Sequence, residues 1–513
     1  MNNDPAGNPI DVAATSYTGN APFEGIAFDN SYARLPEHFH ARMAPRPVAR
    51  PRLIRLNDAL AESLGLDPAA LASEAGVEML AGNRSAAGAD PLAMVYAGHQ
   101  FGNFVPQLGD GRALLLGEVV DARGVRHDIH LKGAGATPFS RGGDGRSSIG
   151  PVVREYLASE AMAALGISTT RALAAIDTGE AVYRQQPEPG GILVRVAQSH
   201  VRVGTFEYFA RRGDIDAVRA LADYVIARHY PELADADRPY QDLFAAVITR
   251  TARLVSSWML VGFIHGVMNT DNTSIAGETI DYGPFGFIDA FDPATVYSSI
   301  DRGGRYAWNR QPAIAQWNLA RLGECLLPLF DDEEKAAIER ANGLLGTFTD
   351  HYSQHFNTGL AAKIGLAEQR DGDTELGLDL LERMHRNRAD FTLTFRRLGR
   401  AAGDDGRGDG PVREQFADPE SFDEWAAAWR RRLAAESRAS ARPAAMDAVN
   451  PAFILRNHLA QQAVDAAIAE QDFGPMRRLA AVLARPFDDQ PGNEEYARPP
   501  RPDEQVLETF CGT

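Results

Sequence analysis

The sequence predicts an α+β protein whose first half is rich in strands and whose second half is helical. Two pairs of strand-like runs lie before residue 205, at Ala113–Val120 with His127–Leu131 and at 172–184 with 191–204. Helical periodicity then dominates, in stretches such as 220–230, 242–264, 312–329, 331–348 and 420–436. A polar stretch, His265–Asp289, interrupts these helices and carries several groups suited to chemistry.

The segment before residue 91 is predicted to wrap around the core as an N-terminal extension (1–90). Its first 20 residues are polar, and prolines at 36, 45, 47 and 51 prevent long regular elements until a helix at Asn57–Ser63. We expect a strand-rich lobe over 91–204, a helical lobe over 205–330, and a helical C-terminal extension with a cysteine-containing tail over 331–513.

The composition argues against nucleic-acid and membrane partners. Hydrophobic residues make up 44% of the 513 and charged residues 24%, and the net charge is −17, which opposes binding to a polyanion. No apolar run reaches the roughly 18 residues of a transmembrane helix, and the N-terminus lacks the features of a signal peptide. We therefore expect a cytoplasmic monomer. Cys325 is expected to be a buried core thiol, and Cys511 to lie in an exposed tail.

Lysine is so rare that each one is informative. The chain has 52 basic residues but only three lysines, of which Lys335 and Lys363 are expected on helix surfaces, whereas Lys132 ends a predicted strand. Before these strands lies Gly109-Asp110-Gly111-Arg112, and such glycines let backbone N–H groups approach phosphate oxygens. The order of glycine loop, strands and lysine is that of a kinase N-lobe. It favours Lys132 as a phosphate ligand.

A second Gly-Asp-Gly-Arg sequence, Gly143–Arg146, precedes a predicted helix that Pro151 begins and Gly166 ends. The repeat is either a coincidence of composition or a second loop facing phosphate. A kinase holds its strand lysine with a glutamate on this helix. The helical wheel places Glu160 within the apolar face and Glu155 at its margin, so periodicity by itself favours Glu160.

Two arginines follow in the last predicted strand. Arg195 interrupts the apolar run Ile192–Val196, and Arg202 lies seven residues later. An arginine in so apolar a strand is expected to have a partner, because burying it unpaired is costly.

The stretch His265–Asp289 resembles the catalytic segment of a kinase, which reads His-Arg-Asp-Leu-x-x-x-Asn and later Asp-Phe-Gly. His265 lies seven residues before Asn272, and Asp281-Tyr282-Gly283 fills the second motif. Val267 stands where the catalytic Asp would be, so the nearest carboxylate is Asp271. Between the two motifs we expect a hairpin, with strands at 274–275 and 279–280 and a turn at 276–278.

These residue types suit a metal-dependent phosphate chemistry. Asn272 and Asp281 offer the oxygen ligands that Mg²⁺ or Mn²⁺ takes, and Asp271 could accept the proton of an attacking hydroxyl. The competing interpretation is that Asp271-Asn272 forms an Asx turn and that Asp281 is a solvated loop acid. Together these elements predict a protein-kinase-like bilobal fold with N- and C-terminal extensions.

Several long strings resemble the selenoprotein O family, the YdiU-type protein adenylyltransferases with a pseudokinase fold. They are FDNSYARLPEHFHARMAP, YAGHQFGNFVPQLGDGRALLLGEV, LKGAGATPFSRGGDGR, HGVMNTDNTSI and IDYGPFGFIDAFDP. The resemblance runs from about Phe23 to Cys511. It implies that ATP binds in an orientation flipped relative to kinases, and that AMP passes to Ser, Thr or Tyr hydroxyls of protein substrates, with uridylyl transfer from UTP as an alternative.

The resemblance also assigns roles to individual residues. It implies that Gly109, Gly111 and Arg112 form the first nucleotide-binding loop, that Lys132 binds phosphate, that Asp144 and Gly145 help to hold the nucleotide, and that Arg195 and Arg202 lie on the phosphates. It further implies Asp271 as the proton acceptor, Asn272 and Asp281 as metal ligands, Asp281 as a nucleotide contact as well, and Glu155, in place of Glu160, as the partner of Lys132.

The resemblance is incomplete at the C-terminus. Many relatives have selenocysteine where this chain has Cys511, and some bacterial relatives carry a cysteine where this chain has Ser298 and Ser299. Three functions therefore stay open: adenylyl transfer to proteins, kinase-type phosphoryl transfer, and nucleotide binding without catalysis, the last suggested by Val267.

Overall fold

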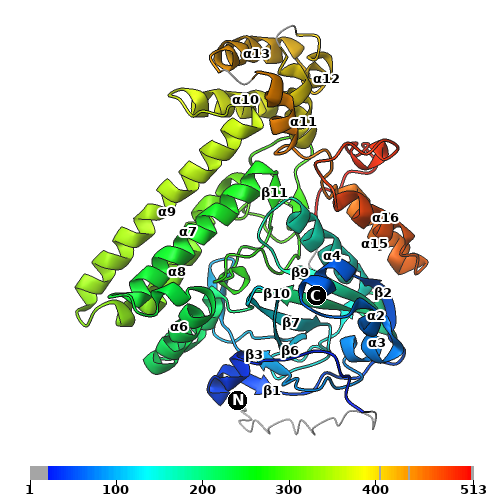
Figure 1. The fold of residues 1–513 in the computed structure, drawn as a ribbon, viewed down its shortest axis with the longest axis vertical. Helices are drawn as coiled ribbons and strands as arrows, with labels where there is room; N and C mark the ends of the chain where they lie inside the picture. Colours follow the sequence, from blue (N-terminus) through cyan, green and yellow to red (C-terminus); the bar gives the residue numbers. More distant parts are fainter. Residues whose placement is uncertain (1–20, 404–405, 437–438, 510–513) are drawn as a thin grey trace, which may run out of the picture.

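The computed structural model describes residues 21–403, 406–436 and 439–509, and Cys511 lies outside these ranges. It confirms a mixed α and β protein with a strand-rich N-terminal part and a helical C-terminal part. Figure 1 shows the sheet in blue to teal at the lower right, with the helices of the C-terminal part to its left and above it.

One eight-stranded sheet forms the N-terminal part. Its order is β1-β3-β6-β7-β10-β9-β2, with β8 paired to β10, and every pairing is antiparallel. The strands are β1 (His40–Arg42), β2 (Arg52–Leu56), β3 (Leu92–Met94), β6 (Ala113–Val120), β7 (Arg126–Lys132), β8 (Ser147–Ser148), β9 (Arg171–Tyr183) and β10 (Pro187–Ala197). Both edge strands of the main path, β1 and β2, come from the segment before residue 90.

The predicted strands are confirmed, and their register aligns three polar side chains. In β7, His130 and Lys132 are two residues apart and so point to the same face of the sheet. His130 pairs with Arg195 of β10, which brings these side chains together on that face. The predicted fourth strand ends at Ala197, earlier than expected, so Arg202 lies beyond it as the N-cap residue of α5 (Val203–Ala210).

Helix α4 (Ile149–Ala164) packs on β9 and β10 and begins two residues before the predicted Pro151. On its other side lie α15 (Asn457–Ala469) and α16 (Gly474–Leu483), from the far end of the chain (Figure 1). Three shorter helices, α1 (Asp58–Ser63), α2 (Pro68–Ala72) and α3 (Glu74–Leu80), lie near the edge formed by β2 and β9. The predicted helix near Asn57 is confirmed as α1, with Asn57 as its N-cap.

Long helices build the C-terminal part. Helices α7, α8 and α9 lie side by side, with α6 near their lower end (Figure 1). Their bounds are α6 (Ile215–His229), α7 (Pro239–Leu260), α8 (Gln311–Phe330) and α9 (Glu334–Lys363). Cys325 of α8 is buried, as expected. None of the helices in the described ranges is both long and apolar enough to cross a membrane.

A second hydrophobic core holds the helices at the top of Figure 1 together. They are α10 (Asp373–Asn387), α11 (Phe391–Ala401), α12 (Gly410–Arg413), α13 (Pro419–Ala434) and α14 (Arg442–Asp447). The surface position expected for Lys363 is wrong. It is only 4% exposed, and its ammonium lies 4.3 Å from the ring centre of Phe395, because the last turn of α9 is covered by α11 and α14.

The hairpin expected within His265–Asp289 is also wrong. Ser274 pairs with Arg202, and Thr279 pairs with Thr169, so the two halves bind other segments and not each other. The turn itself exists, with the Gly277 N–H donating to the Ser274 carbonyl at 3.3 Å. A short two-stranded sheet, β11 (Phe263–Ile264) with β12 (Gly286–Phe287), brackets this stretch instead.

Candidate active site

Asp281 is the centre of a cluster of charges drawn from both parts of the protein. Its Oδ1 accepts from Arg195 Nη1 at 2.6 Å and lies 3.5 Å from Lys132 Nζ, and its Oδ2 accepts from Arg202 Nη1 at 2.8 Å. Burial would raise the pKa of Asp281, but the charges of Arg202, Arg195 and Lys132 outweigh burial and hold the pKa well below its ordinary value. Its backbone has φ of 56°, a conformation that is costly for residues other than glycine and that recurs at functional sites.

Lys132 is held by two carboxylates. Its ammonium donates to Glu155 of α4 as well as approaching Asp281. Glu155 also accepts from Arg195 Nη1, at 3.2 Å. Glu160, which periodicity favours, is instead bound by Arg171 at 2.7 Å and by the side chain of Asn57. The structure therefore brings Glu155, and not Glu160, to the lysine, because α4 turns Glu155 toward β7 and β10.

Asp271 lies in a 3₁₀ turn (Thr270–Asn272) under a small hairpin, β4 (Gly98–Gln100) with β5 (Asn103–Val105). Its Oδ2 accepts from the side-chain amide of Gln100 at 3.2 Å. Its Oδ1 is buried and has no hydrogen-bond partner within the described ranges. Burial, opposed by the Gln100 hydrogen bond and by Arg202, raises the pKa of Asp271 to about 7.

Glycine allows the hairpin to approach Asp271 so closely. A Cβ on Gly98 would lie 2.5 Å from Asp271 Oδ1. The hairpin is anchored by the His99 backbone N–H, which donates to the Thr270 hydroxyl at 2.7 Å. Glu207 of α5 then binds both His99 Nδ1 and the Thr270 hydroxyl, each at 2.5 Å. The prediction from sequence did not include Gln100 or Glu207, because their contacts cross more than 60 residues of chain.

The side chain of Asn272 is held by a hydrogen bond to the loop before it. Its side-chain NH₂ donates to the Val267 carbonyl at 2.9 Å, which leaves its amide oxygen available. With the carboxylate of Asp281, this oxygen belongs to the hard donor set that Mg²⁺ and Mn²⁺ prefer. No group of three or more His, Cys, Asp or Glu side chains that could hold a metal exists in the described ranges. Two protein ligands suit a cation that completes its shell with substrate phosphates and water.

The first glycine loop is packed tightly beside this cluster. A Cβ on Gly109 would lie 2.5 Å from the Phe139 ring, and one on Gly111 2.8 Å from the Phe139 carbonyl oxygen. Between them, Asp110 is 3% exposed and its Oδ2 accepts the Met94 backbone N–H at 3.0 Å. The Arg112 carbonyl accepts the N–H of Gly133 at 2.7 Å, which ties the loop to the residue after Lys132.

The second loop is held by different partners. Asp144 accepts two hydrogen bonds from Arg184, at 2.9 and 3.2 Å, and its side chain is 46% exposed. The Gly145 carbonyl accepts the N–H of Gly135 at 3.0 Å. The loop is thus joined to the segment that follows Lys132, and its carboxylate faces Arg184 and not the Asp281 cluster.

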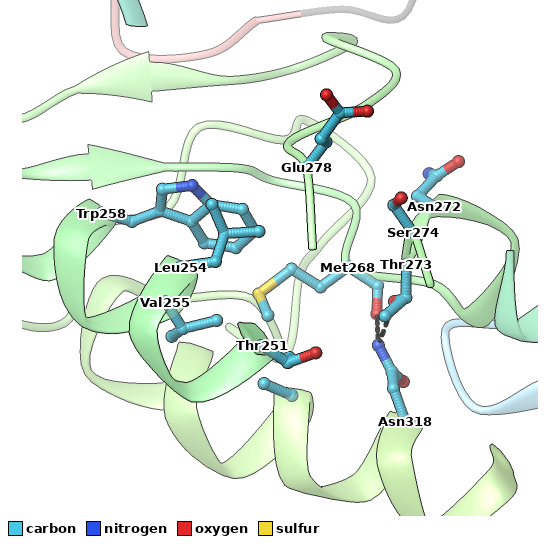
Figure 2. Close-up of a pocket in the computed structure, with 11 residues that line it drawn as sticks. Thr251, Leu254, Val255, Trp258, Met268, Asn272, Thr273, Ser274, Glu278 and Asn318 are labelled. Carbon is cyan, nitrogen blue, oxygen red and sulfur yellow. Dashed lines mark hydrogen bonds between the residues drawn. The ribbon is translucent and has the colours of Figure 1, made fainter. Parts of the chain in front are cut away.

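A cavity behind Asn272 is too small for a nucleotide. It measures about 20 Å³, room for about one water molecule. Figure 2 shows Asn318 at its edge, donating to the Met268 carbonyl at 3.0 Å and to the Thr273 hydroxyl at 2.9 Å. These two hydrogen bonds hold the loop that contains Asp271 and Asn272 from the side of the cavity. This cavity is therefore not a candidate for a nucleotide site.

Comparisons with a family profile and with individual proteins agree with each other. The family profile described as Protein adenylyltransferase SelO matches residues 22–484. The chain is 63% identical over 487 residues to the Protein nucleotidyltransferase YdiU of Alkalilimnicola ehrlichii, covering 95% of this chain and 98% of that protein. It is 60% identical to the protein of the same name from Bradyrhizobium diazoefficiens and 61% identical to one from Rhodopseudomonas palustris, covering in both cases 95% of this chain and 99% of the relative.

Proposed function

The chain belongs to the SelO family of protein adenylyltransferases and is a nucleotidyltransferase, and from this premise we propose that it transfers AMP from ATP to Ser, Thr or Tyr hydroxyls of protein substrates in a reaction that needs Mg²⁺ or Mn²⁺. The observation that carries the proposal is the convergence of Lys132, Arg195 and Arg202 on Asp281. With Glu155, which pairs with Lys132 and Arg195, the cluster holds three cations against two carboxylates, and polyphosphate oxygens are the ligands that the remaining positive charge attracts.

The arrangement around Lys132 supports a kinase-like bilobal fold. In a kinase, a strand lysine pairs with a helix glutamate, and the Asp of the Asp-Phe-Gly motif lies opposite. Here β7 supplies Lys132, α4 supplies Glu155 and the loop after Ile280 supplies Asp281. We propose that the glycine loops at Gly109–Arg112 and Gly143–Arg146 hold the rest of the nucleotide, and that the parts before 91 and after 330 are extensions of this fold.

The proposed reaction is a displacement at the α-phosphorus. The oxygen of the acceptor hydroxyl forms a bond to the α-phosphorus, the bond from that phosphorus to the α,β-bridging oxygen breaks, and pyrophosphate leaves. Asp271 accepts the hydroxyl proton, in place of the carboxylate that Val267 cannot provide. Arg195, Arg202 and Lys132 bind the phosphate oxygens and neutralise charge as the bond breaks. The cation held by Asn272 and Asp281 would supply further charge neutralisation at the phosphates.

The test is to incubate the protein and an acceptor protein with ATP labelled at either the α- or the γ-phosphate. We expect label on protein from the α position alone. Label from the γ position alone would indicate phosphoryl transfer, and no label from either would indicate nucleotide binding without catalysis. The same assay with UTP labelled at the α-phosphate measures uridylyl transfer. We also propose that the protein is cytoplasmic and acts as a monomer. Light scattering measures the oligomeric state.

A further inference from the structure

A buried histidine joins the first glycine loop to one of the phosphate-binding arginines. His130 of β7 has no exposed surface, and its ring lies between Asp110 and Arg195. It is two residues from Lys132 on the same face of the sheet and pairs in register with Arg195. The proposed reaction gives His130 no part, yet its ring contacts two of the structures that form the nucleotide site.

The contacts of the ring define its protonation. Arg195 Nη2 lies 3.0 Å from His130 Nδ1, and a guanidinium can only donate, so Nδ1 must accept. The ring proton is therefore on Nε2, which lies 3.2 Å from Asp110 Oδ2 and donates to it. Burial lowers the pKa of His130, although Asp110 opposes the shift, so the ring is neutral. A protonated ring would point a second donor at the guanidinium.

Each neighbour of the ring is itself fixed. Asp110 also binds β3, because its Oδ2 accepts the Met94 N–H and its own N–H donates to the Met94 carbonyl, both at 3.0 Å. Arg195 is held on its other amino group by Asp281 and Glu155. The remaining face of the His130 ring stacks on His200 at 4.2 Å, and His200 binds Asp128 at 2.9 Å. Arg202 is the other charged group near this cluster.

We propose that His130 is a positioning residue, which orients Arg195 for the phosphates and couples that orientation to the glycine loop through Asp110. The inference rests on the proposed function, since it takes Arg195 as a phosphate ligand. The geometry supports it, because a long arginine side chain has several rotamers and the acceptor at Nδ1 selects one of them. Pre-orienting Arg195 lowers the cost of ordering it when phosphate binds.

Three substitutions separate the two contacts. In His130→Asn, the amide oxygen lies near the place of Nδ1 and can still accept from Arg195. In His130→Gln, the amide nitrogen can take the place of Nε2 and reach Asp110, while the amide oxygen no longer occupies the place of Nδ1 beside Arg195. His130→Phe keeps the ring and its stacking on His200 and removes both contacts. A matched control is His200→Phe, which changes the stacked partner without touching Arg195 or Asp110.

The readout is the affinity for a non-hydrolysable ATP analogue with Mg²⁺, measured by calorimetry, with a thermal melt of each variant. We expect His130→Phe and His130→Gln to weaken binding about tenfold or more, and His130→Asn and His200→Phe to remain within about threefold of the wild type. In an Arg195→Lys background, which cannot make the same fork of hydrogen bonds, His130→Phe should add less than about twofold.

Equal losses in His130→Asn and His130→Phe, or an undiminished loss in the Arg195→Lys background, would overturn the proposal. If His130→Phe does not fold, the Asn and Gln pair decides by itself. Failure of the proposed function is seen separately, because it appears as γ-label transfer or no transfer by the wild-type protein, whereas the coupling of His130 to Arg195 is measured by nucleotide binding alone.

Discussion

The charged cluster around Asp281 and the helical C-terminal part each bury one of the three lysines of the chain, in opposite environments. Lys132 in the cluster is 8% exposed and has two carboxylate neighbours, Glu155 and Asp281. Lys363 at the end of α9 is 4% exposed, and within the described ranges its ammonium forms no ion pair but lies over the rings of Phe391 and Phe395. Burial lowers the pKa of Lys363 to about 7.

Burial of a charge therefore does not by itself indicate a functional site. In the cluster around Asp281, each cation lies within 3.5 Å of a carboxylate oxygen. At the end of α9, a cation lies over aromatic rings, where its desolvation costs stability and cation–π attraction offsets a part of that cost.

The largest effect is expected from removing Asp281, the carboxylate around which Lys132, Arg195 and Arg202 gather. Asp281→Ala should abolish the Mg²⁺- or Mn²⁺-dependent binding of ATP, because the variant lacks one of two proposed metal ligands and leaves three cations without their common partner. Calorimetry with and without metal measures this, and circular dichroism controls for folding. Metal-dependent binding equal to that of the wild type would refute the assignment of Asp281.

Asp271 should affect turnover and not binding. Asp271→Ala is expected to lower kcat by roughly 10²–10⁴-fold, the usual contribution of a general base, with nucleotide affinity within a few-fold of the wild type. Steady-state kinetics with a protein acceptor and calorimetry with ATP give the two values. Loss of ATP binding as complete as in Asp281→Ala would make Asp271 a ligand, and loss of neither would leave the Asx-turn interpretation.

Lys132→Arg tests whether the cluster around Asp281 needs a compact positive charge. The larger, planar guanidinium has to fit between Glu155 and Asp281 in a site that is almost closed, so we expect transfer to fall about tenfold or more, and further in Lys132→Ala. The control is Lys335→Arg, on an exposed face of α9. Wild-type rates in Lys132→Arg would mean that the lysine does not hold phosphate.

Lys363→Met should make the protein more stable at neutral pH. Since the pKa of Lys363 is lowered in the folded state, the unfolded chain binds one more proton between about pH 7 and the ordinary lysine pKa of about 10.4, and stability rises with pH over that range. We expect the variant to gain about 2 kcal/mol at pH 7, allowing for lost cation–π contacts, and the gain to shrink as the pH approaches 10.

Urea unfolding of Lys363→Met and wild type, measured from pH 6 to 10, checks this prediction, and Lys335→Met is the exposed control. A gain that does not depend on pH would mean that the ammonium is solvated in the folded protein. Transfer activity should not change in either variant, because neither Lys363 nor Lys335 belongs to the charge cluster around Asp281.

Local patterns in the sequence determined most of the secondary structure. The apolar run at Ala113–Val120 and the turn Asp121–Gly124 predicted β6 with its observed bounds and the hairpin to β7, because both depend on neighbours in the chain. The same holds for α4, whose proline and glycine signals placed its ends within two residues. Nucleotide chemistry was indicated by the motifs around Lys132, Asp271, Asn272 and Asp281. Each of these motifs consists of residues that are close together in the chain, so the sequence shows it directly.

Tertiary structure decided what spacing does not encode. It decided that Glu155, and not Glu160, pairs with Lys132. The helical wheel gives the direction of each side chain around the axis of α4, but it does not give the position of β7 and β10 beside that helix. It buried Lys363 under α11 and paired Ser274 and Thr279 with distant segments in place of each other. It also placed Gln100 and His130 against Asp271 and Arg195. In each case the deciding contact joins residues far apart in the chain, and its energy depends on packing and desolvation that no local pattern records.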